Sequence, residues 1–140
     1  MSTSSQRVRQ KAVLRQLYTK ALQGDLAIID RVFASTFVDH SSPDQAPGPA
    51  GVRAYFYAVR RAFPDIRVVL DHVIAEEDYI VLRTTWQGTH LGSYEGIPAT
   101  GQRVSRTLIQ IFRMARGLIL EEWNEGPGLL DALRRPPEGG

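Results

Sequence analysis

The chain has 140 residues, of which 43% are hydrophobic and 23% are charged, a composition typical of one globular domain. It contains no cysteine, which excludes disulfide bonds and thiolate metal sites. Its net charge is +2 and its arginines are scattered along the chain, whereas nucleic-acid-binding domains gather them on one face, so we expect no nucleic-acid partner.

The N-terminal end of the chain is polar. Residues 1–10 lack the apolar segment of a signal peptide, and nowhere do 18 apolar residues follow one another. We therefore expect a cytoplasmic protein with no membrane segment. It should fold as a single domain over residues 1–140, with residues 1–8 and 135–140 frayed.

Three helices are predicted before any strand. Residues 7–23 carry apolar side chains at helical spacing and are followed by Gly24, a residue suited to ending a helix. Asp25 can cap a second helix, and a third begins at Pro49 and ends before Pro64. The three apolar faces consist of Leu14, Leu17, Tyr18 and Ala21; of Ile28, Ile29, Val32 and Phe33; and of Val52, Tyr55, Phe56, Val59 and Phe63.

From Ile66 onward the apolar residues alternate with a period of two, which indicates strands. Strands are expected over residues 66–74, 79–88, 104–114 and 118–124. The glycine-rich segment 88–101 is predicted to be a long ordered loop at the mouth of a site, because glycine and proline disfavour regular structure. Helices followed by an antiparallel sheet predict an α+β fold with the helices on one face of the sheet.

Several motifs occur in an order and spacing that resemble one protein family. They are FVDHSSP at residues 37–43, AFPD at 62–65, GTH at 88–90 and GIPATG at 96–101, followed by Gly117 and by Glu122-Trp123. Over roughly residues 10–133 the chain resembles the SnoaL-like polyketide cyclases, often labelled ester cyclases. The resemblance implies a cystatin-like cone, in which a curved, mostly antiparallel sheet wraps over N-terminal helices and encloses a pocket. It also implies cofactor-free cyclisation or isomerisation of a hydrophobic, polyketide-like carbonyl compound by proton transfer.

The resemblance assigns the acid/base roles to two positions that hold amides in this chain. SnoaL-like cyclases place an aspartate directly after the tryptophan position of the last strand, and a histidine on the strand before it. These positions hold Asn124 and Gln110, which do not exchange protons near neutral pH and are expected to orient the substrate. The acid/base is then expected to be Glu122, which shares a strand face with Asn124, or His40, which follows the second helix.

Both acid/base candidates have a structural alternative. Glu122 is a carboxylate that an arginine such as Arg83 or Arg113 would hold in place, and His40 is a capping or surface residue. Ketosteroid isomerases, which share the cone, use an aspartate from about the region of His40 together with a tyrosine of the first helix. Tyr18 occupies a suitable position for that tyrosine.

Apolar residues predict two kinds of partner: those lining the pocket predict a hydrophobic small-molecule substrate, and those on the outer sheet face predict a homodimer. Aromatic residues suit a flat polycyclic ligand, although any core of this size needs them too. The outer sheet face should carry Ile109, Ile111, Ile119 and Trp123, too large an apolar patch to remain in water, so two copies are expected to pack sheet to sheet. The predicted pocket lining is Tyr18, Phe33, Phe37, Tyr55, Phe56, Trp86, Leu108 and Phe112.

The remaining histidines favour structural roles, and neither a metal nor a cofactor is expected. His90 is expected to stabilise the glycine-rich loop through hydrogen bonds, and His72 to lie within the sheet. Three scattered histidines do not form the converging ligand set that a metal needs. Two other functions stay open, a non-catalytic ligand-binding protein and an accessory protein for ring hydroxylation.

Overall fold

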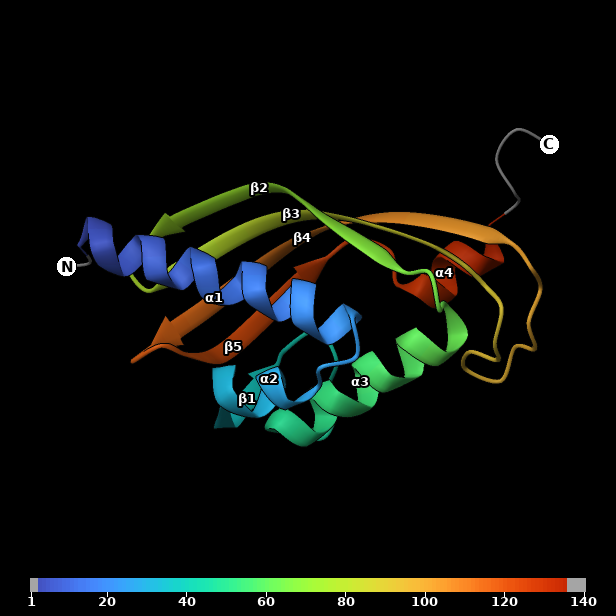
Figure 1. The fold of residues 1–140 in the computed structure, drawn as a ribbon, viewed down its shortest axis with the longest axis horizontal. Helices are drawn as coiled ribbons and strands as arrows, with labels where there is room; N and C mark the ends of the chain where they lie inside the picture. Colours follow the sequence, from blue (N-terminus) through green and yellow to red (C-terminus); the bar gives the residue numbers. More distant parts are fainter. Residues whose placement is uncertain (1–2, 136–140) are drawn as a thin grey trace.

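A computed structural model of the protein describes residues 3–135 (Figure 1). The helices are α1 (Ser4–Leu22), α2 (Ala27–Val32), α3 (Pro49–Ala62) and α4 (Leu129–Arg134). The strands are β1 (Phe33–Asp39), β2 (Arg67–Glu76), β3 (Tyr79–Thr89), β4 (Arg103–Ala115) and β5 (Leu118–Glu125). None of the helices in this part of the chain is long and apolar enough to cross a membrane.

The strands form one curved sheet in the order β1-β5-β4-β3-β2. All neighbouring pairs are antiparallel except β1 and β5, which are parallel. Helices α1, α2 and α3 lie on the concave side of this sheet (Figure 1). The predicted α+β fold, with N-terminal helices against a curved sheet, is therefore confirmed.

The apolar faces predicted for the helices form the core. Leu14, Leu17 and Ala21 of α1 are fully or almost fully buried, as are Ile29 of α2 and Val59 of α3. Burial of this stripe along each helix, rather than intrinsic helix propensity, supplies most of the stability of such helices.

α1 begins earlier than the sequence pattern predicts. The Thr3 side chain accepts a hydrogen bond of 3.0 Å from the Gln6 backbone N–H, which is the N-cap arrangement. Residues 4–8, for which fraying was expected, are helical. Residues 1–2 and 136–140 lie outside the described residues.

The prediction that three helices precede the sheet is wrong, because β1 lies between α2 and α3. This strand pairs with β5, about 85 residues further along the chain, with Asp39 opposite Glu122. Such pairing leaves no signal in the neighbouring sequence. Helix α4 was not predicted either.

β5 contains an irregularity that changes which side chains face the core. In the pairing of β4 with β5, Arg113 lies opposite Glu121 and Met114 opposite Ile119, so that Leu120 has no partner. One extra residue in a strand reverses the alternation of side chains on either side of it. Ile119 is therefore completely buried, and the prediction that it lies on the outer face is wrong.

The outer face of the sheet carries no helix of the described residues (Figure 1). Ile109 and Ile111 are exposed there, and Trp123 is partly exposed. Pairing of two copies across this face stays a prediction.

The glycine-rich segment after β3 packs on the C-terminal end of α3. The Leu91 and Gly92 amides donate to the Ala62 carbonyl, at 2.9 and 3.0 Å. His90 is buried, and its Nδ1 accepts a hydrogen bond of 3.2 Å from the Thr100 amide. His90 thus stabilises the loop, but residues 90–102 are not part of the cavity lining described below. His72 is exposed on β2.

Candidate active site

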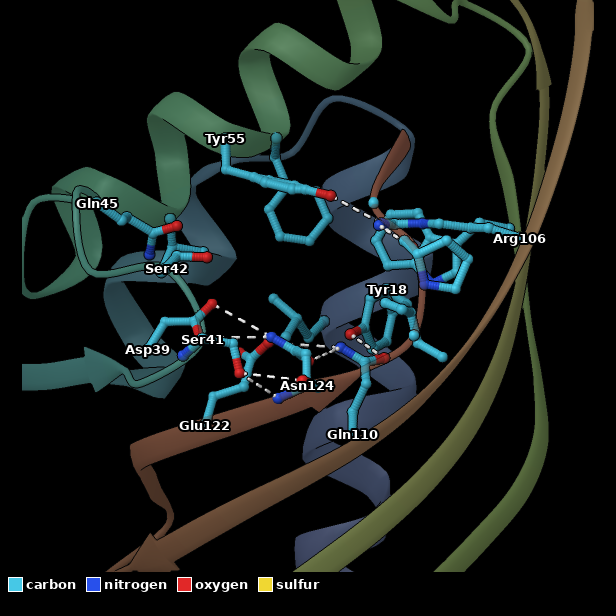
Figure 2. Close-up of a pocket in the computed structure, with 18 of the residues that line it drawn as sticks. Tyr18, Asp39, Ser41, Ser42, Gln45, Tyr55, Arg106, Gln110, Glu122 and Asn124 are labelled. Carbon is cyan, nitrogen blue, oxygen red and sulfur yellow. Dashed lines mark hydrogen bonds between the residues drawn. The ribbon is translucent and has the colours of Figure 1, made fainter. Parts of the chain in front are cut away.

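A cavity of about 340 Å³ lies between the concave face of the sheet and the helices. This volume lies within the range of sites that bind small molecules. Apolar and aromatic side chains from α1, α3, β3 and β4 form much of its wall. Polar side chains converge on it from the end of β1, from β4 and from β5 (Figure 2).

Hydrogen bonds fix the orientation of Gln110, whose side chain lies beside Tyr18 and Asn124 in Figure 2. Trp86 Nε1 donates to Thr84 Oγ1 at 3.0 Å, and Thr84 Oγ1 lies 2.8 Å from Gln110 Oε1. An indole N–H can only donate, so the Thr84 hydroxyl accepts from Trp86 and gives its own proton to Gln110. The Tyr18 hydroxyl donates to the same Gln110 oxygen at 3.1 Å.

The Gln110 amide group extends these hydrogen bonds to the end of β1. Its Nε2 donates to Asn124 Oδ1 at 2.9 Å and, more weakly, to Glu122 Oε2 at 3.4 Å. Asn124 Nδ2 in turn points at the Asp39 carboxylate, 3.3 Å from Oδ2. The two amides therefore orient two carboxyl groups.

Backbone contacts bring Asp39 and Glu122 to adjacent positions on β1 and β5. The two residues are opposite each other in the parallel pairing, and the His40 amide donates to the Glu122 carbonyl at 2.9 Å. Ser41 ties the end of β1 to β5, since its hydroxyl accepts from the Asn124 amide at 2.7 Å. Both carboxyl groups belong to the cavity lining.

Burial makes both carboxyl groups harder to ionise. It raises the pKa of Glu122 to about 8, and the neighbouring Asp39 charge adds to the rise. Burial also raises the pKa of Asp39, against the opposing effect of the hydrogen bond from the Ser41 amide. A carboxyl group with a pKa of about 8, as in Glu122, is able to exchange a proton near neutral pH.

The pKa of Glu122 makes folding stability depend on pH. The unfolded chain ionises this group at about its ordinary value of 4.5, so stability is lost as pH rises from there towards 8. Because the side chain is partly exposed, we expect an effect of about 1–2 kcal/mol. Urea unfolding at pH 5, 7 and 9 should show this loss in the wild type and a flatter profile in Glu122→Gln. Glu125→Gln, at the exposed end of the same strand, should keep the wild-type slope.

A second polar cluster in the cavity contains Arg106, Tyr55 and Trp86. Arg106 Nη2 donates to Tyr55 Oη at 2.8 Å, and the guanidinium lies over the Trp86 ring, 4.3 Å from its centroid. Arg106 is 7% exposed, and its Nε is buried without a hydrogen-bond partner. This cluster consists of a buried cation on an aromatic surface.

Most residues that the sequence analysis assigned to the site line this cavity. Gln110, Glu122 and Asn124 lie together. The alternative in which Arg83 or Arg113 holds Glu122 is not seen, because Arg83 pairs with Asp71 and Arg113 with Glu121. The predicted lining residues found in the cavity wall are Tyr18, Phe33, Tyr55, Phe56, Trp86 and Leu108.

Three of the assigned residues lie elsewhere. His40 is exposed on the outer side of the sheet, where its ring stacks on Trp123 at 4.9 Å and Nε2 lies 3.1 Å from Glu121 Oε1. Phe37 and Phe112 are completely buried in the core and are absent from the cavity wall. Alternation along β1 explains the position of His40, because the residue after an inward-facing Asp39 faces outward.

Asp39 and Arg106 are two site residues that were not predicted from the sequence. Alternation along β1 would have placed Asp39 on the face of Phe37, but residues 33–39 were not identified as a strand. Arg106 shares the inner face of β4 with Val104 and Leu108. A single arginine within an otherwise apolar stripe of the sequence could have identified it as a site residue. Within residues 3–135, no group of three or more His, Cys, Asp or Glu side chains is arranged to hold a metal ion.

Comparison with proteins of known structure identifies close matches to the fold. TsrD from Streptomyces laurentii is 28% identical, with 96% of each chain covered and a TM-score of 0.81. AclR from Streptomyces galilaeus, a proposed hydroxylase, is 27% identical over 92% of this chain and 98% of its own, with a TM-score of 0.78. A proposed SnoaL-like polyketide cyclase from Jannaschia sp. CCS1 shares the fold at 21% identity, with coverage of 98% and 99% and a TM-score of 0.82.

No protein of curated function matches this chain in sequence. The sequence model of the SnoaL-like polyketide cyclases, however, matches residues 12–126, which include β1, β4 and β5 and nearly all of the cavity wall. The protein therefore belongs to the SnoaL-like polyketide cyclase family.

Proposed function

We propose that the protein is an enzyme that cyclises or isomerises a hydrophobic carbonyl compound by proton transfer, without a cofactor. The observation that carries this proposal is the pair of carboxyl groups, Asp39 and Glu122, on adjacent strands at one cavity. Removal of a proton next to a carbonyl needs a base, and stabilisation of the resulting enolate needs an acid or hydrogen-bond donors.

The surroundings of the two carboxyl groups favour different roles. Asp39 accepts hydrogen bonds from the Ser41 amide at 2.9 Å and from Asn124 Nδ2, and both favour the ionised form. Glu122, with its pKa raised to about 8, keeps its proton at neutral pH. Asp39 is thus the base and Glu122 the acid of the resting enzyme.

One proton-transfer cycle then follows from these charges. The Asp39 carboxylate removes the proton from the carbon next to the substrate carbonyl, and the C–H electron pair forms a C=C bond while Glu122 protonates the carbonyl oxygen. In cyclisation the enol carbon attacks a second carbonyl carbon, and the oxygen of that carbonyl takes the proton from Asp39. In isomerisation a more distant carbon takes that proton instead. The proton on the enol oxygen returns to Glu122, so both carboxyl groups regain their starting states.

The cavity wall supports a flat, apolar substrate. Tyr18 and Trp86 lie edge to face at 5.7 Å, and Phe56 adds a third ring beside Tyr18 at 6.3 Å. Such surfaces bind fused aromatic rings, and their burial excludes water from a reactive enol. A polyketide-like compound fits this chemistry, which agrees with the family description.

A non-catalytic binding protein is the main alternative, since the same aromatic wall would bind a ligand without changing it. A hydroxylation role is favoured by the likeness to AclR, a proposed hydroxylase. The two alternatives share one consequence, because neither requires the protein to exchange the protons next to a carbonyl group.

Proton exchange in D₂O separates the proposal from both alternatives. Aryl ketones, anthraquinone esters bearing a ketone and steroid enones would be incubated with the protein, and loss of the proton signal next to the carbonyl followed by NMR. We expect at least one compound to exchange about 10³-fold faster than in buffer. A compound that binds in the cavity with no acceleration of exchange would favour the binding protein.

A further inference from the structure

We propose that the end of the cavity formed by Arg106 and Tyr55 binds an anionic oxygen of the substrate, so that the substrate is an aromatic carbonyl compound that also carries a carboxylate. This inference rests on the proposed function for the position of the reacting carbonyl. Its binding test, described below, needs no turnover.

Arg106 is a buried cation that forms no salt bridge with the described residues. The side chain is 7% exposed, yet within residues 3–135 no carboxylate lies within 4.0 Å of its guanidinium. Its hydrogen-bond and ring partners are neutral, namely Tyr55 Oη, the Trp86 ring and, at 3.4 Å, the Pro127 carbonyl. The Arg106 charge also acts on Glu122, but with a pKa of about 8 that carboxyl group keeps its proton at neutral pH. Burial of an unpaired charge is costly, so an anion brought by the ligand would offset that cost.

Arg106 and Tyr55 also carry hydrogen-bond donors that no group in the described part of the chain uses. Arg106 Nε is buried with no hydrogen-bond partner, and a guanidinium binds a carboxylate best through two parallel N–H groups. Tyr55 accepts from Arg106 and therefore still has its own hydroxyl proton to donate. Both residues belong to the cavity wall, so a carboxylate there would receive hydrogen bonds from each.

Arg106 and Tyr55 lie away from the proposed acid and base. Figure 2 shows Arg106 and Tyr55 on one side of the cavity and Asp39 and Glu122 on another, with Gln110 and Asn124 between. Arg106 and Gln110 share the inner face of β4 four residues apart, which corresponds to about 13 Å along a strand. That spacing suits a ligand of two or three fused rings with the carboxylate at one end and the carbonyl at the other.

The charges in the cavity also fix the direction in which such a ligand binds. The Asp39 carboxylate would repel a second anion, so the ligand carboxylate is directed to Arg106. Asp131, the third acidic residue of the wall besides Asp39 and Glu122, is exposed and accepts a hydrogen bond of 2.9 Å from the Gly128 amide. The buried cation is therefore the site at which a carboxylate gains most.

The test compares anthraquinone-2-carboxylate with its methyl ester, which has the same rings and no charge. Affinities would be measured by calorimetry and by quenching of Trp86 fluorescence in a Trp123→Phe background, since Trp123 lies on the outer face. We expect the wild type to bind the acid at least about 10-fold more tightly than the ester. Arg106→Gln should weaken binding of the acid about 10–100-fold and leave the ester within about threefold, because a charged hydrogen-bond pair is lost only with the acid.

Three further variants sharpen the result. Arg106→Lys should retain part of the preference for the acid, and Tyr55→Phe should reduce it by a few-fold. Arg103→Gln, exposed at the start of the same strand, removes the same charge outside the cavity and should leave both affinities unchanged. Equal affinity of the wild type for acid and ester, equal losses for both in Arg106→Gln, or no saturable binding of the acid would each overturn the proposal.

The outcomes are separable from those of the exchange experiment. Selective binding of the acid without any proton exchange would leave the Arg106 site standing and reject only the proposed catalysis. Proton exchange on neutral ketones, together with equal binding of the acid and its ester, would support the proposed catalysis and reject the Arg106 site.

Discussion

Asp39→Asn should lower the rate of proton exchange by about 10²–10⁴-fold while ligand affinity stays within a few-fold of the wild type. Asparagine has the shape of aspartate, and its Oδ1 can still accept from the Ser41 amide. What it lacks is the basic carboxylate that takes the proton. The loss should therefore appear in kcat, measured by NMR under saturating ketone, and not in KM.

Glu122→Gln should lower the same rate about 10²-fold or more, because the enol oxygen loses its proton donor. A glutamine still offers a hydrogen bond to the developing negative charge, so this loss is expected to be the smaller of the two. The pH dependence of the remaining activity should also lose the step near pH 8 that ionisation of Glu122 produces in the wild type.

Neighbouring residues on the opposite face provide matched controls. Glu121→Gln removes a carboxylate that pairs with His40 and Arg113 outside the cavity, and His40→Ala removes the histidine that the sequence analysis considered as the base. Both variants should keep exchange within about threefold of the wild type. The assignment would be falsified if His40→Ala abolished exchange, or if Asp39→Asn and Glu122→Gln both retained it.

Local sequence patterns predicted the parts of the fold whose order depends on near neighbours. Helical spacing of apolar residues located α1 and α3, and alternation located β2 to β5, because each pattern records which side of one element is buried. β1 escaped prediction because its partner is β5, at the far end of the chain. A short strand with a distant partner resembles a loop in the sequence.

The same distinction explains why Asp39 was missed as a site residue. Gln110 and Asn124 were identified through the resemblance to SnoaL-like cyclases, and Glu122 because it shares a strand face with Asn124. Asp39 depended on β1 and was missed. Its meeting with Glu122 is a property of the parallel pairing, which no pattern within either segment contains.

The irregularity in β5 is the clearest case of a feature that alternation alone predicts wrongly. Counted in steps of two, Ile119 shares a face with Glu121 and Trp123, both on the outer side. The extra residue at Leu120 reverses this relation, so that Ile119 is buried with the core while Glu122 and Asn124 still face the cavity. The bulge thus lets one strand contribute to the core and to the site.

Ile119→Asn should therefore destabilise the protein by about 3–5 kcal/mol, whereas Ile111→Asn should cost about 1 kcal/mol or less. Ile119 is 0% exposed, so asparagine there leaves a cavity and an amide without solvent. Ile111, on the outer face, is 36% exposed and its replacement remains hydrated. Urea unfolding followed by circular dichroism would measure both values.

Unfolding at two protein concentrations controls for association of copies through the outer face. If two copies pair there, stability rises with concentration and Ile111→Asn removes that dependence, but the loss caused by Ile119→Asn persists at every concentration. Similar losses of unfolding free energy in the two variants at low concentration would contradict the reversed alternation at Leu120, because simple alternation places both isoleucines on the same face. A large loss confined to Ile119→Asn would show that the bulge at Leu120 turns this end of β5 towards the core.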